Sequence, residues 1–128
     1  MFSNRFIISV GDNFYPKGVK SVDDPQWKTT FEDVYSAPSL NCRWYIVGGN
    51  HDEYSNISAQ IAYTIKSPRW YFPNYYYRET IFETPDLAKQ PLLQVSHIQH
   101  PLPKHNKSTP LLDMIFLDSA MLLNGTRL

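Results

Sequence analysis

Apolar residues gather in three short runs that predict strands. Residues 5–10 (RFIISV) and 43–47 (RWYIV) are β-branched or aromatic runs of strand length, each followed by glycine, and we predict that both are buried strands. Residues 111–119 (LLDMIFLDS) predict a last apolar strand. The aromatic segment after Pro68, RWYFPNYYYRETIFET, indicates a loop that leads into a further strand.

Two segments between these runs have helical spacing. Asp24 supplies an N-cap and Pro25 a first-turn proline, which predict a helix over residues 25–36. A second helix is predicted after the second strand. The apolar positions that define the two helices are Trp27, Phe31, Val34 and Tyr35 for the first, and Ile57, Ile61 and Ile65 for the second.

Strand, helix, strand, helix is the order of a unit whose strands pair in parallel. Residues 84–110 hold five of the ten prolines and three histidines without periodicity, so we predict a long loop or insertion there. The expected fold class is therefore α/β, a βαβα unit followed by a loop-rich β segment. At 128 residues the chain is at most one domain.

Charge and composition exclude several classes of function. The 12 basic and 12 acidic side chains cancel, which removes the electrostatic argument for nucleic acid or an anionic membrane as partner. No run approaches the roughly 18 apolar residues of a membrane span. Cys42 is the one cysteine, so there is no internal disulfide, and we interpret it as a small hydrophobic residue.

Polar side chains follow the first two predicted strands. Asp12 and Tyr15 lie in Gly-Asp-Asn-Phe-Tyr, and Asn50 and His51 lie in Gly-Gly-Asn-His-Asp. Because neighbouring parallel strands end at one crevice, the two clusters are expected to converge. Carboxylate, amide and imidazole donors together make a plausible site for hard cations.

Each residue suits a two-metal site. The two oxygens of Asp12 can bridge cations about 3.5 to 4 Å apart, and a trivalent cation would strip the Tyr15 proton, which points toward ferric iron. Asn50 offers a neutral oxygen to a divalent ion, and His51 is a ligand or a nearby proton donor. The alternatives are an ordinary Gly-Asp-Asn turn, a packing role for Tyr15, and an Asx turn that caps the second helix. The pairing of the two motifs favours the metal site.

GDNFY followed by GGNHD resembles two signature blocks of the binuclear metallophosphoesterases, and the tyrosine marks the purple acid phosphatases. The segments GVKSVDDPQWKTTFEDVYS, WYIVGGNHD, NISAQIAY and RWYFPNYYYR are similar, in order, to the tartrate-resistant type. The resemblance covers about residues 5–82 and the FLDS strand near residue 118. It implies that residues 1–128 are part of a calcineurin-like metallophosphoesterase domain, an α/β sandwich, with 84–110 as a loop insertion.

By resemblance, Asp12 bridges two metals, Tyr15 binds Fe(III), and Asn50 binds a divalent ion, which is Fe, Zn or Mn. His51 contacts the phosphate ester and protonates the leaving alkoxide. The implied reaction is hydrolysis of phosphate monoesters at acid pH by a metal-bound hydroxide, with no nucleic-acid partner. The resemblance also implies a secretory location, extracellular, lysosomal or vacuolar, and a glycan on Asn56 within Asn-Ile-Ser.

The chain departs from the family pattern in its later ligands. The family has an earlier Asp in an Asp-x-Gly block, which would precede Met1, and later histidines including a Gly-His-x-His block. His97, His100 and His105 lack that context, and we interpret them as exposed loop histidines. We therefore expect an incomplete domain, from truncation or an incomplete gene model, that is weak or inactive as a phosphatase by itself.

Two other functions are open. DDPQWKTTFEDVYS and FPNYYY also resemble the acid-phosphatase-like scaffold of the apicomplexan gliding machinery, a membrane-associated anchor. Such scaffolds tend to lose the GDNFY and GNHD chemistry, and both blocks are intact here, which favours enzyme ancestry. The other alternative, a generic nucleotide or phosphodiester hydrolase, is disfavoured by Tyr15.

Overall fold

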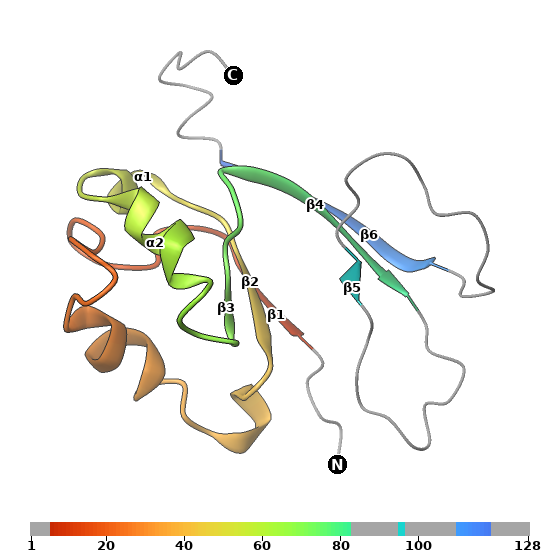
Figure 1. The fold of residues 1–128 in the computed structure, drawn as a ribbon, viewed down its shortest axis with the longest axis horizontal. Coiled ribbons are helices and arrows are strands. Elements are labelled where there is room, and N and C mark those ends of the chain that lie inside the picture. Colours follow the sequence, from red (N-terminus) through yellow and green to blue (C-terminus); the bar gives the residue numbers. More distant parts are fainter. Residues whose placement is uncertain (1–5, 83–94, 97–109, 119–128) are drawn as a thin grey trace.

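A three-stranded parallel sheet lies at the centre of the structure, a computed structural model that describes residues 6–82, 95–96 and 110–118. Its strands are β1 (Phe6–Ser9), β2 (Arg43–Ile46) and β3 (Trp70–Tyr71), in the order β1-β2-β3 (Figure 1). The predicted parallel pairing is confirmed, with Phe6 opposite Arg43 and Ser9 opposite Ile46. β3 was missed because its two residues are too short a run to show periodicity.

The first predicted strand is less buried than expected. β1 forms one edge of the sheet in the described part of the chain, where Ile8 is 44% exposed. Val10, which was expected to end the strand, lies beyond it and is 86% exposed. An apolar run identifies a strand, but whether the strand is central or at an edge depends on its neighbours.

Four short helical segments cover one face of this sheet (Figure 1). The first, η1, spans Trp27–Glu32 and has π-helical hydrogen bonds. Its N-cap residue is Gln26 and not Asp24 as predicted, although Asp24 Oδ1 accepts from the Gln26 backbone N–H at 2.9 Å. The others are the 3₁₀ turn η2 (Pro38–Leu40), α1 (Asn50–Glu53) and α2 (Ile57–Tyr63).

Both predicted helices are shorter than expected. The wider winding of a π-helix, in which the Asp33 N–H bonds to the Lys28 carbonyl five residues back, moves later positions off the buried face. Val34 is consequently 58% exposed. Likewise α2 ends at Tyr63, so Ile65 is 92% exposed rather than part of the apolar face.

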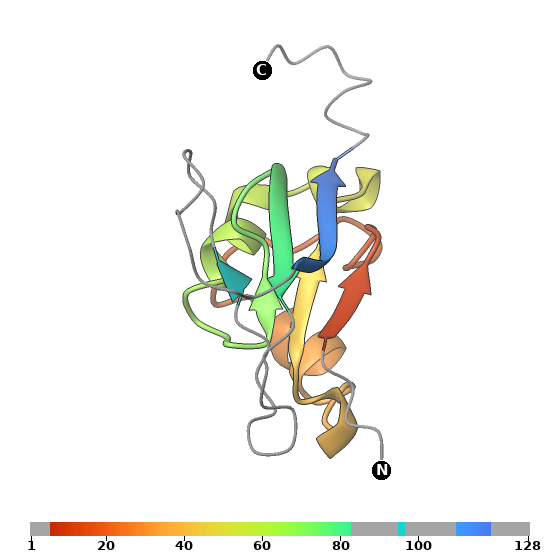
Figure 2. The same ribbon diagram turned by 90° about the vertical axis from the view of Figure 1, so that its right-hand side faces the viewer.

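An antiparallel ribbon lies on the other side of the parallel sheet (Figures 1 and 2). It comprises β4 (Tyr76–Phe82), β5 (Val95–Ser96) and β6 (Pro110–Leu117), in the order β5-β4-β6. β6 confirms the predicted last strand. β5 falls inside the predicted 84–110 insertion, most of which lies outside the described residues, and it pairs with β4 through Val95 and Ile81.

The central strand β2 buries both of its faces, which gives the structure two apolar cores. Trp44 and Ile46 face the helices, where they pack with Trp27, Phe31 and other buried residues. Tyr45 faces the ribbon and packs in a second cluster with Tyr71, Ile81, Met114 and Phe116. This α/β arrangement agrees with the expected fold class.

Candidate metal centre

The loops that follow β1 and β2 meet at the carboxyl ends of these strands. Asp12 lies at the point of contact: its Oδ1 accepts from the His51 backbone N–H at 3.1 Å, and its Oδ2 accepts from the Tyr15 hydroxyl at 2.8 Å. The structure therefore brings three of the four predicted residues together, with His51 contacting Asp12 through its backbone. Since 39 residues separate Asp12 from His51, the parallel register of β1 and β2 is what positions them.

The backbone around Asp12 is closely fitted to the second loop. Asp12 has a positive φ of 50°, a conformation that costs a non-glycine residue of order 1–3 kcal/mol and is kept where surrounding contacts enforce it. Gly49 permits the close approach, because a Cβ there would overlap with both the backbone nitrogen and Oδ1 of Asp12. A glycine at this position is thus required for the Asp12 carboxylate to lie where it does.

The same contacts determine the protonation of the two acidic groups. The hydrogen bond from the His51 backbone, followed by that from Tyr15, holds the pKa of the Asp12 carboxyl below its ordinary value. In return, the hydrogen bond to Asp12 raises the pKa of the Tyr15 phenol above its ordinary value. Without a cation, the pair is therefore a carboxylate and a protonated phenol.

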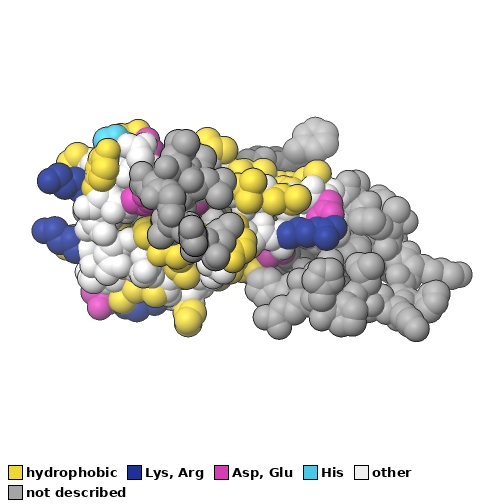
Figure 3. All heavy atoms as spheres, turned by 90° about the horizontal axis from the view of Figure 1, so that it is seen from above, with side chains coloured by type: hydrophobic (Ala, Val, Ile, Leu, Met, Phe, Trp, Pro, Cys, Tyr) yellow, Lys and Arg dark blue, Asp and Glu magenta, His cyan; other side chains and the backbone are white. Residues whose placement is uncertain are grey.

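His51 is oriented by the first loop. Its Nδ1 lies 2.8 Å from the Pro16 carbonyl oxygen, which can only accept, so Nδ1 carries a proton and Nε2 faces away from this bond. The ring lies between those of Tyr15 and Tyr54, at centroid distances of 4.5 and 5.3 Å. Figure 3 shows the one histidine of the described residues, in cyan, at the surface beside side chains of the hydrophobic class.

Asn50 is the fourth predicted site residue, and its described side-chain hydrogen bond is to Tyr54. It is the first residue of α1, and its amide Nδ2 donates to the Tyr54 hydroxyl at 3.3 Å. With the nitrogen so engaged, Oδ1 is the atom left to serve as a metal donor. Tyr54, which is 62% exposed, was not singled out from the sequence as part of this site.

The residue that joins the two loops is Asp52, to which sequence reasoning assigned no role. It is fully buried, and its carboxylate accepts from three backbone N–H groups: from Asn13 at 3.0 and 3.1 Å, from Phe14 at 3.2 Å and from Gly49 at 2.9 Å. Side-chain amides of Asn13 and Gln60 donate to it as well, at 3.0 and 2.9 Å. Asp52 thereby ties the residue after Asp12 to the residue before Asn50.

Gln60 completes this network from α2. Its side chain is fully buried, and its backbone carbonyl accepts from the Trp70 indole at 2.9 Å. A signal was present in the sequence: Gln60 is a polar residue at a position that helical spacing from Ile57 places beside the apolar face. A polar side chain buried in that way needs a partner, and Asp52 is that partner.

The ribbon reaches the site through Asp118. Asp118 follows β6, is 3% exposed, and donates its backbone N–H to the Tyr75 carbonyl at 3.2 Å. A Cβ on Gly48 would overlap with Asp118 Oδ2, so the ribbon's end packs directly against the second loop. Gly48 therefore has to be a glycine for a reason different from that at Gly49.

The donor types fit hard cations, although the described residues supply only part of a coordination shell. Asp12 and Tyr15 present two oxygens to one point, and Asn50 adds an amide oxygen nearby in sequence, which are the ligands that hard cations prefer. Among residues 6–82, 95–96 and 110–118, no group of three or more His, Cys, Asp or Glu side chains could hold a metal ion.

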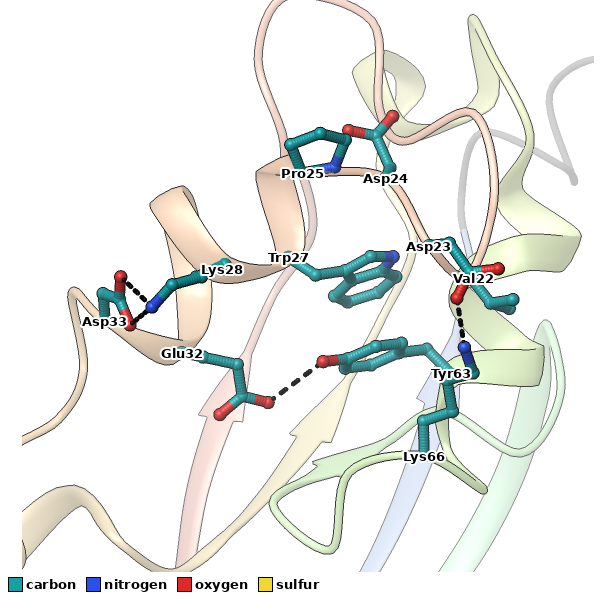
Figure 4. Close-up of a pocket in the computed structure, with 10 residues that line it drawn as sticks. All are labelled: Val22, Asp23, Asp24, Pro25, Trp27, Lys28, Glu32, Asp33, Tyr63 and Lys66. Atoms are coloured by element: carbon teal, nitrogen blue, oxygen red, sulfur yellow. Dashed lines mark hydrogen bonds and ion pairs between the residues drawn. The ribbon is translucent and has the colours of Figure 1, made fainter.

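A separate pocket lies among η1, the loop before it and the end of α2 (Figure 4). Its volume is about 600 Å³, and none of the four predicted site residues lines it. Trp27 and Tyr63 stack there at a centroid distance of 3.6 Å, and the ion pairs Lys28–Asp33 and Lys66–Asp23 flank them. The charged side chains that line it already have hydrogen-bond or ion-pair partners, so we do not include it in the site.

Comparison with known proteins gives homologues but no matching family model. Tartrate-resistant acid phosphatase type 5 of Oryctolagus cuniculus is 54% identical over 79 residues, which are 61% of this chain and 24% of that protein. The Homo sapiens protein of the same name is 53% identical over 74 residues, 57% of this chain and 23% of that protein. Purple acid phosphatase 7 of Arabidopsis thaliana is 48% identical over 65 residues, 51% of this chain and 20% of that protein.

A solved structure is also similar. It is described as "GAP50 the anchor in the inner membrane complex of Plasmodium", with a TM-score of 0.55 and 34% identity over 62% of this chain and 27% of that one. The chain thus spans about a quarter of the length of the proteins that it matches. In the described part of the chain, no helix has the length and apolar character needed to cross a bilayer.

Proposed function

We propose, from the homology of this chain to the tartrate-resistant and purple acid phosphatases, that it carries part of an acid phosphatase site which hydrolyses phosphate monoesters. Residues 1–128 would be part of a calcineurin-like metallophosphoesterase domain. The observation that supports the proposal most is the contact of the Asp12 carboxylate with the Tyr15 hydroxyl, at 2.8 Å, beside His51. A carboxylate and a phenol oriented toward each other can face one cation together.

In this proposal the centre is binuclear, with Fe(III) and a divalent ion that is Fe, Zn or Mn. Asp12 would contribute its carboxylate to both ions, Tyr15 would hold the ferric ion as phenolate, and Asn50 would hold the divalent ion through Oδ1. When bound, such ions lower the pKa of water and neutralise charge on the phosphoryl oxygens.

The remaining chemistry falls to His51. At acid pH a histidine carries a proton on both ring nitrogens. In His51, Nδ1 keeps its proton and donates it in a hydrogen bond to the Pro16 carbonyl, so Nε2 is the atom that would give a proton to the departing alkoxide. The backbone N–H of His51 meanwhile holds Asp12 Oδ1 in place.

Reconstitution with ferric iron tests the ligand assignment. The loaded chain should show the purple colour of phenolate-to-iron charge transfer, and Tyr15→Phe should abolish it. The control is Tyr76→Phe, because Tyr76 lies on the ribbon, 48% exposed, and should leave the colour unchanged. Colour that persists in Tyr15→Phe would remove Tyr15 from the ligand set.

Hydrolysis of p-nitrophenyl phosphate tests the activity. Because the described residues supply only part of a coordination shell, we expect the 128-residue chain to be weakly active or inactive by itself. Efficient turnover with retained iron would contradict this expectation. The coding sequence on both sides is a second test: an in-frame Asp-x-Gly block upstream and a Gly-His-x-His block downstream would supply the other ligands.

A scaffold function is the second candidate, and the similarity to the Plasmodium anchor favours it. A scaffold needs the fold but not the cation donors. In a protein that also carries the Asp-x-Gly and Gly-His-x-His blocks, iron binding that depends on Tyr15 supports the enzyme, whereas a folded protein that binds neither iron nor zinc supports the scaffold.

We further propose that the protein passes through the secretory pathway and carries a glycan on Asn56. Asn56 is exposed at the N-cap of α2, where its Oδ1 accepts from Ala59 and its Nδ2 donates to the Lys20 carbonyl at 3.2 Å. A glycan replaces one of the two Nδ2 protons, which leaves one for this bond. Expression in a secreting eukaryotic host should give a mass shift that Asn56→Asp removes.

A further inference from the structure

β6 is a long strand at the edge of the ribbon. It has eight residues, and the strand order β5-β4-β6 gives it one neighbour, β4, among the described strands (Figure 2). The other described edges are shorter, because β5 has two residues and β1, at the edge of the parallel sheet, has four. A long edge strand presents a row of backbone donors and acceptors with which another strand can pair, so β6 is the described edge best suited to such pairing.

The hydrogen-bond pattern shows which backbone groups of β6 face away from β4. The Asp118 N–H, one residue after Leu117, donates to the Tyr75 carbonyl at 3.2 Å. In an antiparallel ladder, a hydrogen-bonded pair alternates with a pair whose N–H and C=O groups point away from the partner strand. The backbone groups of Asp113, Ile115 and Leu117 are therefore directed to the outer edge of the ribbon.

The outer face of the ribbon beside this edge is apolar. Ile115 is 71% exposed, Leu117 is 55% exposed, and Tyr76 of β4, opposite Leu117, is 48% exposed. Where the ribbon lies, Figure 3 shows hydrophobic side chains at the surface beside basic and acidic ones. The outer face of an antiparallel sheet is commonly polar when water covers it, so apolar residues at these positions favour an interaction surface.

The middle of β6 also lacks the features that usually keep edge strands apart. Charged side chains and bulges are two such features. The one charged residue of β6 is Asp113, and it already accepts from Arg78 Nε of β4 at 2.9 Å. Residues 114–117 (MIFL) carry no charge, and the irregularity in the pairing of β4 with β6 lies at the other end, between Ile81 and Phe82.

We propose that β6 pairs with β6 of a second copy of this chain, antiparallel across a two-fold axis, so that two ribbons form one continuous sheet. Pairing centred on Phe116 places Ile115 opposite Leu117 of the second copy, and each such pair exchanges two hydrogen bonds through the backbone groups that face the edge.

The charges favour a second copy as the occupant of this edge. The paired stretch is uncharged, and the two Asp113 carboxylates lie at its opposite ends, each beside its own Arg78. The chain as a whole has a formal net charge of zero, which removes long-range repulsion between copies. The pairing uses neither the candidate metal centre nor a bound metal, so it does not rest on the proposed phosphatase function.

Sedimentation equilibrium of the metal-free 128-residue chain tests the proposal. The mass should rise with concentration from 14.9 kDa toward twice that value and no further, because a two-fold interface is closed. A chain that stays monomeric up to about 100 µM, a concentration at which even a weak specific dimer is populated, would overturn the proposal. Oligomers that continue to grow beyond the dimer would overturn it as well.

Ile115→Pro tests the edge directly. Proline has no N–H, and the N–H of Ile115 faces away from β4, so the pairing of β4 with β6 keeps its hydrogen bonds. The dimer loses one donor from each copy, and its dissociation constant should rise roughly tenfold to a hundredfold. Ile115→Lys covers the case in which the proline variant does not fold, because a lysine is tolerated at this exposed position and opposes edge pairing.

Tyr76→Lys is the matched control. It adds the same charge as Ile115→Lys on the same face of the ribbon, but on β4, one strand away from the edge. The dissociation constant should therefore stay unchanged. A dimer that Tyr76→Lys weakens as much as Ile115→Lys does would be joined face to face, and edge pairing would be refuted.

Amide hydrogen exchange supplies a readout specific to the edge. As the concentration of the unmodified chain rises, exchange at Ile115 and Leu117 should slow, because their N–H groups enter the new ladder. Exchange at Met114 and Phe116, whose N–H groups face β4, should change little. A dimer without this alternation along β6 would contradict the proposed pairing.

Discussion

The Asp52 carboxylate accepts a hydrogen bond from the Gln60 side-chain amide, with 2.9 Å between Oδ1 and Nε2, and both side chains are fully buried. This contact links α2 to the loops that carry Asp12 and His51. The geometry of the candidate metal centre therefore depends on residues that need not touch a metal or a substrate.

Asp52→Asn should strongly destabilise the fold. The new amide would bring an NH₂ group against donors from Asn13, Phe14 and Gly49, and it would remove the charge that strengthens their hydrogen bonds. Hydrogen bonds to a charged group contribute about 1.5–3 kcal/mol each, so we expect a loss of at least about 3 kcal/mol in the free energy of unfolding. Urea denaturation measures it. Asp33→Asn, at an exposed ion pair, is the control and should cost less than about 1 kcal/mol.

Gly49→Ala should displace Asp12. The added methyl group would overlap with Asp12 Oδ1 and its backbone nitrogen, and forced overpacking costs about 1–3 kcal/mol. The His51 to Asp12 hydrogen bond should be lost, which amide exchange at His51 detects. Ser55→Ala, at an exposed position between the two α-helices, should leave that exchange rate unchanged. Unchanged protection in Gly49→Ala would mean that the loop can shift without losing the contact.

The Tyr15 phenol should titrate above the ordinary tyrosine range in the metal-free chain. Its proton is held by Asp12, so Asp12→Asn should bring the pKa back toward the ordinary value of about 10. The Tyr15–Asp12 hydrogen bond therefore stabilises the fold below the unfolded-state pKa of about 10. That stabilisation is lost as pH rises through the folded-state pKa of Tyr15. NMR of ¹³C-labelled tyrosine separates Tyr15 from the others, and an Asp12→Asn spectrum that titrates as before would be inconsistent with this pairing.

Arg69→Met should lower the free energy of unfolding by more than the loss of an exposed ion pair does. The Arg69 guanidinium pairs with Glu32, donates to the Tyr35 carbonyl at 2.5 Å, and lies 4.8 Å from the centroid of the Phe31 ring. The Arg69 side chain is only 10% exposed and that of Glu32 is 31% exposed. We therefore expect the free energy of unfolding to fall by about 2–3 kcal/mol, which is less than the full cost of breaking a buried pair. Lys28→Met is the control, at less than about 1 kcal/mol. Thermal unfolding of both variants distinguishes these values.

Local pattern predicted much of the fold. The strands at Arg43–Ile46 and Pro110–Leu117 form because apolar, β-branched and aromatic residues suit strands, and a helix begins after Asp24, whose carboxylate accepts from a free backbone N–H at its start. The predicted helix lengths were wrong because an apolar residue such as Ile65 fits helical spacing whether or not the helix continues to that residue.

The candidate site divides in the same way. Asp12, Tyr15, Asn50 and His51 were named from two short motifs, since the chemistry of a metal ligand is visible in its residue type. The roles of Asp52 and Gln60 were not predicted, because the role of a buried acid or amide can be identified only from the groups that surround it in the fold.

By itself, the sequence determined the parallel pairing of the first two strands, the last strand, the donor types and the homology. Only the tertiary structure decided that Asp12 lies against His51, that Asp52 joins their loops, and that Glu79 is buried between two sheets. The physical reason is range. Side-chain periodicity and capping act over a few residues, whereas these contacts join segments 8 to 39 residues apart, which strand pairing and the packing of the two sheets bring together.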